Sequence, residues 1–139
     1  MILLDTNVLS EAVRPVPSEP VLQWLTAQSR GAVYISSVTV AELLLGVEML
    51  APGRRRTRLL AVIENLLAAE FQGRILPFDE SAARLFPKIV AEREAMGRPI
   101  SQFDAIIASV CRSRNAVLAT RNVRDFEHCG IRFVNPWDR

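Results

Sequence analysis

Three carboxylates stand where the surrounding pattern does not call for an acid. Asp5 directly follows an apolar run, Glu42 lies inside the apolar stretch V-T-V-A-E-L-L-L-G-V-E-M-L, and Asp104 begins the run D-A-I-I-A. Clustered carboxylates repel one another and raise each other's pKa unless a cation neutralises them. A set of oxygen ligands without cysteine or histidine favours a hard ion such as Mg²⁺ or Mn²⁺ over zinc. Because such an ion leaves coordination positions for phosphate oxygens, the acids together predict a phosphate compound as substrate.

Each acid also has a structural explanation when it is taken alone. Asp5 can cap the helix that follows it, and Asp104 can be a first-turn acid, in a capping box with Ser101, that the helix dipole favours. Glu42 lies in a helix that is apolar on every side and is therefore expected to be buried, so its carboxylate needs a partner. For Asp104 alone the structural explanation outweighs the functional one, whereas the three acids together favour a site.

The chain contains few other groups that could perform catalysis. His128 is the only histidine and is expected in a loop, which favours a surface residue over a general base. The motifs G-x-x-x-x-G-K, G-x-G-x-x-G and G-x-S-x-G are absent from the sequence. If the protein is a hydrolase, its nucleophile is therefore a water that the cation activates.

The apolar pattern predicts the elements that position these acids. Short strands are expected at Met1–Leu4, Val33–Ile35, Arg74–Phe78, Ala116–Ala119 and Ile131–Val134. Helices are expected from Thr6 or Asn7 to about Arg14, from Ser18 to about Ser29, from Ser36 or Ser37 to Pro52, from Arg54 to about Phe71, from Asp79 to Gly97 and from Phe103 to about Ser113. This alternation predicts an α/β domain whose central parallel sheet of four to five short strands is flanked by helices on both faces. Ligands of such sheets bind at the carboxyl edge, where all three acids are expected.

Composition limits the class of protein. The chain has 139 residues, of which 50% are apolar and 23% are charged, and this predicts one soluble globular domain spanning residues 1–139. There is no apolar run of the roughly 18 residues that a membrane span needs, and no signal-peptide pattern, so a cytoplasmic protein without a membrane partner is expected. Cys111 and Cys129 have no metal-like spacing and are expected to be free thiols, one of them in the core.

Four motifs resemble, in order and spacing, those of PIN domains. They are L-L-D-T-N-V-L-S, S-S-V-T-V-A-E-L-L-L-G, F-D-A-I-I-A-S and A-T-R-N-V-R-D-F. The resemblance covers essentially the whole chain. It is closest to the VapC-type toxins of bacterial toxin–antitoxin pairs and, through G-R-I-L-P-F-D-E and the terminal N-P-W, to their FitB-like group. It implies a PIN-like fold and a Mg²⁺- or Mn²⁺-dependent endoribonuclease, a hydrolase that cleaves RNA phosphodiester bonds.

The resemblance also implies partners and site residues. The protein is expected to form a homodimer and to bind a cognate antitoxin, which blocks the nuclease and contacts operator DNA. The metal-binding and catalytic acids carried over by position are Asp5, Glu42 and Asp104. The supporting polar residues carried over in the same way are Thr6, Asn7 and Thr120.

One position departs from the family pattern. Many PIN domains have a fourth acid in the loop after the penultimate strand, where this chain has Asn122, whose carbonyl can accept a metal or a water but adds no charge. Asp125 can replace that acid or can cap the local turn. In the same loop, Arg121 and Arg124 are candidates for contacts with the RNA backbone, and each also fits an ordinary exposed arginine. The departure supports an alternative function, a weakly active or inactive PIN module that acts mainly in a DNA-bound complex with its antitoxin.

The apolar helix around Glu42 suggests how the dimer forms. Leucine and valine side chains of this helix can either face a second subunit or pack under the helix at residues 54–71, and the sequence favours neither. These side chains are Leu43, Leu44, Val47 and Leu50.

Overall fold

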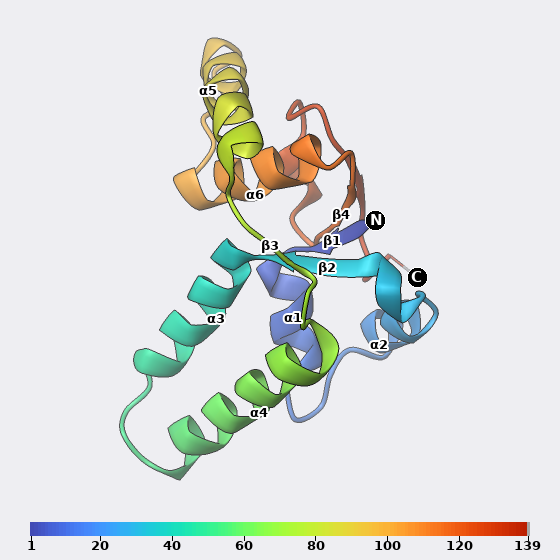
Figure 1. Cartoon of the computed structure of the whole chain (residues 1–139), viewed down its shortest axis with the longest axis vertical. Helices are drawn as coiled ribbons and strands as arrows, with labels where there is room; N and C mark the ends of the chain where they lie inside the picture. The colour runs from blue at the N-terminus through green and yellow to red at the C-terminus, as the bar shows by residue number, and fades with distance from the viewer. Residues whose placement is uncertain (139) are drawn as a thin grey trace.

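Five short strands form a parallel sheet at the centre of the computed structural model, which describes residues 1–138 (Figure 1). In their order across the sheet, the strands are β3 (Ile75–Leu76), β2 (Val33–Ser36), β1 (Ile2–Leu4), β4 (Val117–Ala119) and β5 (Arg132–Val134). All neighbouring pairs are parallel, which confirms the predicted sheet. β3 is shorter than predicted, because Pro77 has no N–H to donate to a neighbouring strand.

Helices connect the strands at the positions that the sequence indicates. They are α1 (Thr6–Ala12), α2 (Glu19–Thr26), α3 (Ser37–Glu48), α4 (Arg54–Glu70), α5 (Glu80–Ala95) and α6 (Gln102–Ser113), with short 3-10 turns η1 (Arg30–Ala32) and η2 (Val123–Phe126). The helices α2 and α3 end a few residues earlier than predicted. No helix within residues 1–138 is both long and apolar enough to cross a membrane.

The strands contribute side chains to two hydrophobic clusters, one on each face of the sheet. Alternate residues of a strand point to opposite faces, so Leu3 of β1 and Leu118 of β4 pack with α5 and α6. Leu4 and Ala119, the next residue in each strand, pack with α1 to α4. Figure 1 shows these two helical layers on either side of the sheet, which confirms the predicted covering of both faces.

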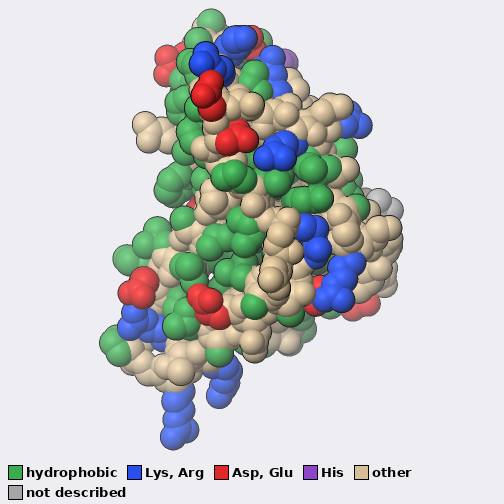
Figure 2. Space-filling view, in the orientation of Figure 1, with side chains coloured by type: hydrophobic (Ala, Val, Ile, Leu, Met, Phe, Trp, Pro, Cys, Tyr) green, Lys and Arg blue, Asp and Glu red, His purple; other side chains and the backbone are tan. Residues whose placement is uncertain are grey.

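The expectation that α3 is buried on every side is wrong. Leu43 and Val47 are buried in the cluster that includes Ile63 of α4, so for these two the packing alternative holds. The opposite face of α3 is open, with Leu45 exposed to 53% and Met49 to 79%. Leu44 and Leu50 are half-buried. In the view of Figure 2, hydrophobic side chains gather over the part of the molecule that contains α3 and α4, and basic side chains lie at the end where α4 begins.

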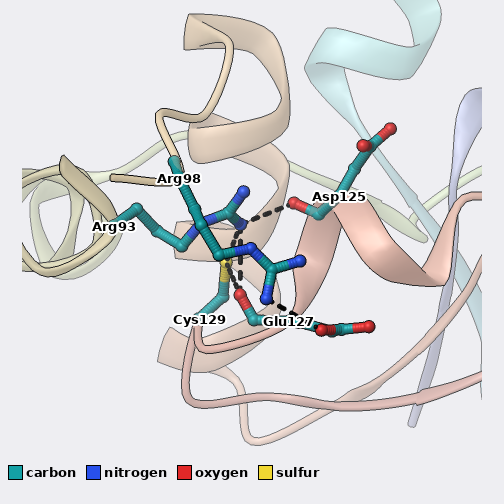
Figure 3. A network of polar contacts seen from close by, with 5 residues as sticks. All are labelled: Arg93, Arg98, Asp125, Glu127 and Cys129. Atoms are coloured by element: carbon teal, nitrogen blue, oxygen red, sulfur yellow. Dashed lines mark hydrogen bonds and ion pairs between the residues drawn. The ribbon is translucent and has the colours of Figure 1, made fainter. Parts of the chain in front are cut away.

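A buried arginine fixes the segment that follows β4. Arg93 of α5 is only 4% exposed, and its guanidinium donates hydrogen bonds to the backbone carbonyls of Arg98 (2.7 Å), Asp125 (2.7 Å) and Glu127 (3.1 Å). The side chains of Arg98 and Glu127 form an ion pair at 3.1 Å beside it (Figure 3). We call this group, with the Cys129 sulfur 3.5 Å from Arg93 Nη1, the Arg93 anchor. Cys129 and Cys111 are both free thiols, and both are buried.

Candidate acidic site at the edge of the sheet

An open cavity of about 530 Å³ lies beyond the carboxyl ends of β1 and β4. At this point the strand order diverges, since the chain leads from β1 toward β2 on one side while β4 and β5 lie on the other, and such divergence points are the usual ligand sites of parallel sheets. All three predicted acids, Asp5, Glu42 and Asp104, line this cavity. The other lining residues are Thr6, Asn7, Ser10, Glu11, Arg14, Arg121, Asn122 and Trp137.

Asp5 both caps a helix and faces the cavity. Its Oδ1 accepts the Thr6 backbone N–H at 2.8 Å and so starts α1, as the structural explanation requires. Its Oδ2 accepts hydrogen bonds from the Thr120 hydroxyl at 2.7 Å and the Asn7 amide at 3.2 Å. The pKa of Asp5 is raised to about 6, chiefly by burial. Hydrogen bonds from Thr120 and Thr6 lower the pKa, and the negative charges of Asp104 and Glu42 add to the rise. The carboxylate is therefore held firmly in an environment that disfavours its charge.

Glu42 reaches the cavity from α3. That helix begins where the Ser36 hydroxyl accepts the Thr39 N–H at 3.2 Å. The hydroxyl of Thr6 donates to Glu42 Oε1 at 2.6 Å and lies 3.0 Å from the hydroxyl of the buried Thr39. Because Thr6 uses its proton on Glu42, Thr39 is the donor to Thr6. Thr6 is thus the partner that a glutamate in this helix requires.

Asp104 enters from the first turn of α6. Its backbone N–H donates to the Ser101 hydroxyl at 3.2 Å, so Ser101 caps α6 and Asp104 is a first-turn acid, as the structural explanation states. The pKa of the half-buried Asp104 carboxyl is raised, chiefly by burial, while hydrogen bonding by Ser101 lowers it and the negative charges of Asp125 and Glu42 raise it. The acids of three different elements therefore interact electrostatically around one cavity.

The candidate residues of the loop after β4 fall into two groups, those that line the cavity and those that do not. Asn122 and Arg121 line the cavity, and the Asn122 N–H donates to the Thr120 hydroxyl at 3.0 Å. Asp125 and Arg124 lie in η2, are exposed and do not line the cavity. Figure 3 shows the Asp125 side chain pointing away from Arg93, which holds the Asp125 carbonyl. Asp125 is nevertheless close enough to Asp104 for its charge to raise the pKa of that acid. His128 is exposed, as predicted.

Several cavity residues did not emerge from the sequence. Three of them, at spacings of three, four and seven after the predicted Asn7, are Ser10, Glu11 and Arg14. These are the spacings of one helix face, so the polar stripe in the sequence indicates that they accompany Asn7 at the cavity. Glu11, only 7% exposed, accepts the Ser18 N–H at 2.9 Å and pairs with Arg14 at 3.3 Å. Trp137 belongs to the N-P-W motif, but nothing in that motif indicates that its ring lies beside the acids.

The donor chemistry of the cavity fits a hard divalent cation. Its carboxylates, hydroxyls and amide carbonyl are all oxygen ligands, and two of the carboxyl groups have raised pKa values that a nearby cation would lower again. Within residues 1–138, no three acidic, histidine or cysteine side chains are arranged to hold an ion as they stand. Asp5 and Glu42 each turn to a threonine hydroxyl instead, so cation binding would draw the carboxylates toward one another.

Known proteins with similar sequences and structures are PIN domains and toxins. Residues 2–131 match the PIN domain family. The chain is 40% identical to Toxin FitB of Neisseria gonorrhoeae over 137 residues, and the match covers 99% of each chain. It is 37% identical over 138 residues to VapC ribonuclease Y4jK of Sinorhizobium fredii, again over 99% of each. Its structure is similar to that of FitAB bound to an IR36 DNA fragment, with a TM-score of 0.94, 39% identity and coverage of 100% of this chain and 97% of that one.

Proposed function

The chain belongs to the PIN domain family, among the FitB and VapC toxins of toxin–antitoxin systems, and from this premise we propose that it cleaves RNA at the acidic cavity. The reaction is the Mg²⁺- or Mn²⁺-dependent hydrolysis of an internal phosphodiester bond. The observation that carries the proposal is the convergence of Asp5, Glu42 and Asp104, from three separate elements, on one open cavity. The VapC relative, which is named as a ribonuclease, supports the same reaction.

Asp5, Glu42 and Asp104 would hold the cation, with Asn122 contributing a neutral oxygen at the fourth position. When bound, the cation lowers the pKa of a water and offsets the charge that develops on the phosphate. Thr120 and Asn7 orient the Asp5 carboxylate through their hydrogen bonds to Oδ2, and Thr6 orients Glu42. These contacts keep both acids at the cavity wall, from which a bound cation would draw them together. Asp125 acts on the site through its charge on Asp104.

The test compares two aspartates that both cap the N-terminus of a helix. Asp5 and Asp79 are both N-caps whose side chains accept a backbone N–H, but only Asp5 lines the cavity. We expect Asp5→Asn to slow cleavage of a panel of structured RNAs by roughly 10²- to 10³-fold or more, as the loss of a charged group acting on the transition state does. Asp79→Asn should cut like the wild type, and EDTA should stop both.

The same assay contains the outcomes that reject the proposal. Cleavage that survives in Asp5→Asn, or that EDTA does not stop, would point to a contaminating nuclease or to another site. A wild-type protein that cuts no RNA with either ion would leave the alternative function, a weakly active or inactive module in a DNA-bound complex. The uncharged Asn122 in the cavity and the similarity to a DNA-bound FitAB structure favour that alternative.

The proposal includes the partners of a toxin. A cognate antitoxin would bind the chain, block the cavity and connect the complex to operator DNA. The similarity to a structure of FitAB bound to a DNA fragment supports a DNA-bound complex. We propose that the protein acts in the cytoplasm, as one domain in a homodimer. The exposed Leu45 of α3 and Met49, its C-cap residue, are the candidates for the dimer contact, in place of the buried Leu43 and Val47.

A further inference from the structure

We infer that Arg121, held against the ring of Trp137, binds an RNA phosphate next to the one that is cleaved. The inference rests on the proposed function and deepens it, because it assigns the substrate-binding side of the same cavity. In this inference Arg121 touches the substrate, and Trp137 is a positioning residue that acts through Arg121.

The guanidinium of Arg121 has a defined support. Its central carbon lies 5.1 Å from the centre of the Trp137 ring, a distance typical of cation–π contacts. The Trp137 ring is itself fixed, since it is half-buried and packs against the hydrophobic cluster of α1 to α4. The Trp137 backbone N–H also donates to the Asn135 side chain at 2.9 Å. A side chain that would otherwise sample many rotamers is therefore restrained beside the cavity.

The backbone of Arg121 is tied to the acidic site from the other side. Its N–H donates to the Asn7 side-chain oxygen at 3.3 Å, and the same Asn7 side chain donates to Asp5. Thr120, the preceding residue, donates to Asp5 as well. Arg121 and the acids are thus positioned by one continuous set of hydrogen bonds.

The charge of Arg121 is available to a ligand. Arg14 and Arg121 are the two arginines that line the cavity, and Arg14 is paired with Glu11 at 3.3 Å. In the part of the chain that the structure describes, no ion pair involves Arg121. A guanidinium stacked on a ring keeps its N–H donors at its edge, where they match the oxygens of a phosphate. The cavity therefore has one side that can hold a cation and another that can hold an anion, as a phosphodiester chain requires.

Binding is measured separately from cleavage. The probe is a fluorescently labelled single-stranded oligoribonucleotide, titrated in Mg²⁺ against protein that carries Asp5→Asn to prevent cutting, with anisotropy as the readout. We expect Arg121→Ala to weaken binding by about tenfold and Trp137→Leu by about threefold, since the first removes a phosphate contact and the second its support. Trp137→Phe, which keeps an aromatic face, should restore most of the loss. Arg84→Ala, which removes an exposed arginine on α5, is the charge-matched control.

Salt dependence distinguishes a phosphate contact from a general structural defect. Removing the neutralisation of one phosphate on a single strand lowers the slope of log K against log salt by about 0.7, so Arg121→Ala should show this reduction. Trp137→Leu keeps the charge and should keep the slope. An Arg121→Ala protein with the parent's affinity, or with a weaker affinity and an unchanged slope, would overturn the inference, as would an Arg84→Ala protein with the same loss.

The outcomes also separate this inference from the proposed function. If the wild type cuts RNA with Mg²⁺ and Arg121→Ala has the same KM and kcat, the nuclease stands and the phosphate subsite is wrong. If Arg121→Ala raises KM with little change in kcat, both are supported. If the oligoribonucleotide binds with the predicted salt slope and no protein cuts it, the contact of Arg121 with a phosphate stands, whereas the nuclease proposal fails and with it the position of that phosphate next to a cleaved one. If no oligoribonucleotide binds, the inference fails.

Discussion

Two regions of this molecule contain buried charged side chains, and they differ in how far hydrogen bonds and neighbouring charges compensate the buried charge. At the Arg93 anchor, a single cation is surrounded by three carbonyl oxygens that accept its hydrogen bonds. At the acidic site, Asp5 is buried to a similar degree, but the carboxylates of Glu42 and Asp104 line the same cavity and help to raise its pKa. In the anchor the hydrogen-bond donors of the buried cation have acceptors, whereas the site has an excess of negative charge.

The difference indicates which region is structural and which is functional. A buried charge whose hydrogen bonds are satisfied holds segments together, and the anchor joins α5 to the segment that carries Asp125. Uncompensated carboxylates destabilise the fold when no ligand is present, and under the proposed function cation binding offsets this destabilisation. Substitutions in the anchor should therefore cost stability, and substitutions in the site should cost activity.

The largest effect on stability is expected at the anchor. Arg93→Met removes the donor that three backbone carbonyls share, and we expect the free energy of unfolding to fall by about 4 kcal/mol. Arg93→Lys keeps the charge and part of the hydrogen bonding, so it should lose less. Urea denaturation of both variants measures the difference. A loss below about 1 kcal/mol for Arg93→Met would mean that the comparison between the two regions is wrong.

The next effect is the pH dependence of the site in EDTA. Because the pKa of Asp5 is raised from 3.8 to about 6 in the folded protein, the folded state binds more protons than the unfolded state between these pH values. Stability due to Asp5 is therefore highest below about pH 4 and falls as the pH rises through 6, by at most about 3 kcal/mol. The measurement is the difference in unfolding free energy between wild type and Asp5→Asn from pH 4 to 8. A difference that does not change with pH would contradict the raised pKa.

A smaller effect concerns the hydrogen bond that partly offsets this cost. Thr120→Val keeps the shape of the fully buried Thr120 but removes its donor to Asp5, and we expect a loss of about 2 kcal/mol at pH 7. The loss should shrink near pH 4, where Asp5 is protonated. Thermal unfolding at the two pH values tests this, and an equal loss at both would show that the hydroxyl acts without regard to the charge.

The smallest effect is expected outside both regions. Arg84 and Glu80 form an ion pair at 2.9 Å on α5, with side chains exposed to 77% and 80%. Water screens such a pair, so Arg84→Ala should change stability by less than about 0.5 kcal/mol. A larger change would show that exposure is a poor guide to which charges matter here.

The fold and the acids could be predicted from the sequence because each depends on local patterns. Continuous apolar strands such as Ile2–Leu4, with helix caps such as Ser101 and Asp79, indicate the elements and their order. The burial of α3 could not be predicted, because its apolar pattern does not reveal that α4 covers only one side. Nor could the contact of Arg121 with Trp137, since residues far apart in the sequence meet only through the packing of the chain end.

The melting temperature of the protein with and without Mn²⁺ tests whether the acidic site binds a cation. If the acidic site offsets its cost by binding a cation, the ion should raise the melting temperature of the wild type and of Asp79→Asn but not that of Asp5→Asn. In EDTA, Asp5→Asn should melt above the wild type, because it lacks the repelling charge. An equal rise with Mn²⁺ in all three proteins, or an Asp5→Asn protein less stable than the wild type in EDTA, would mean that Asp5 is not part of a cation site.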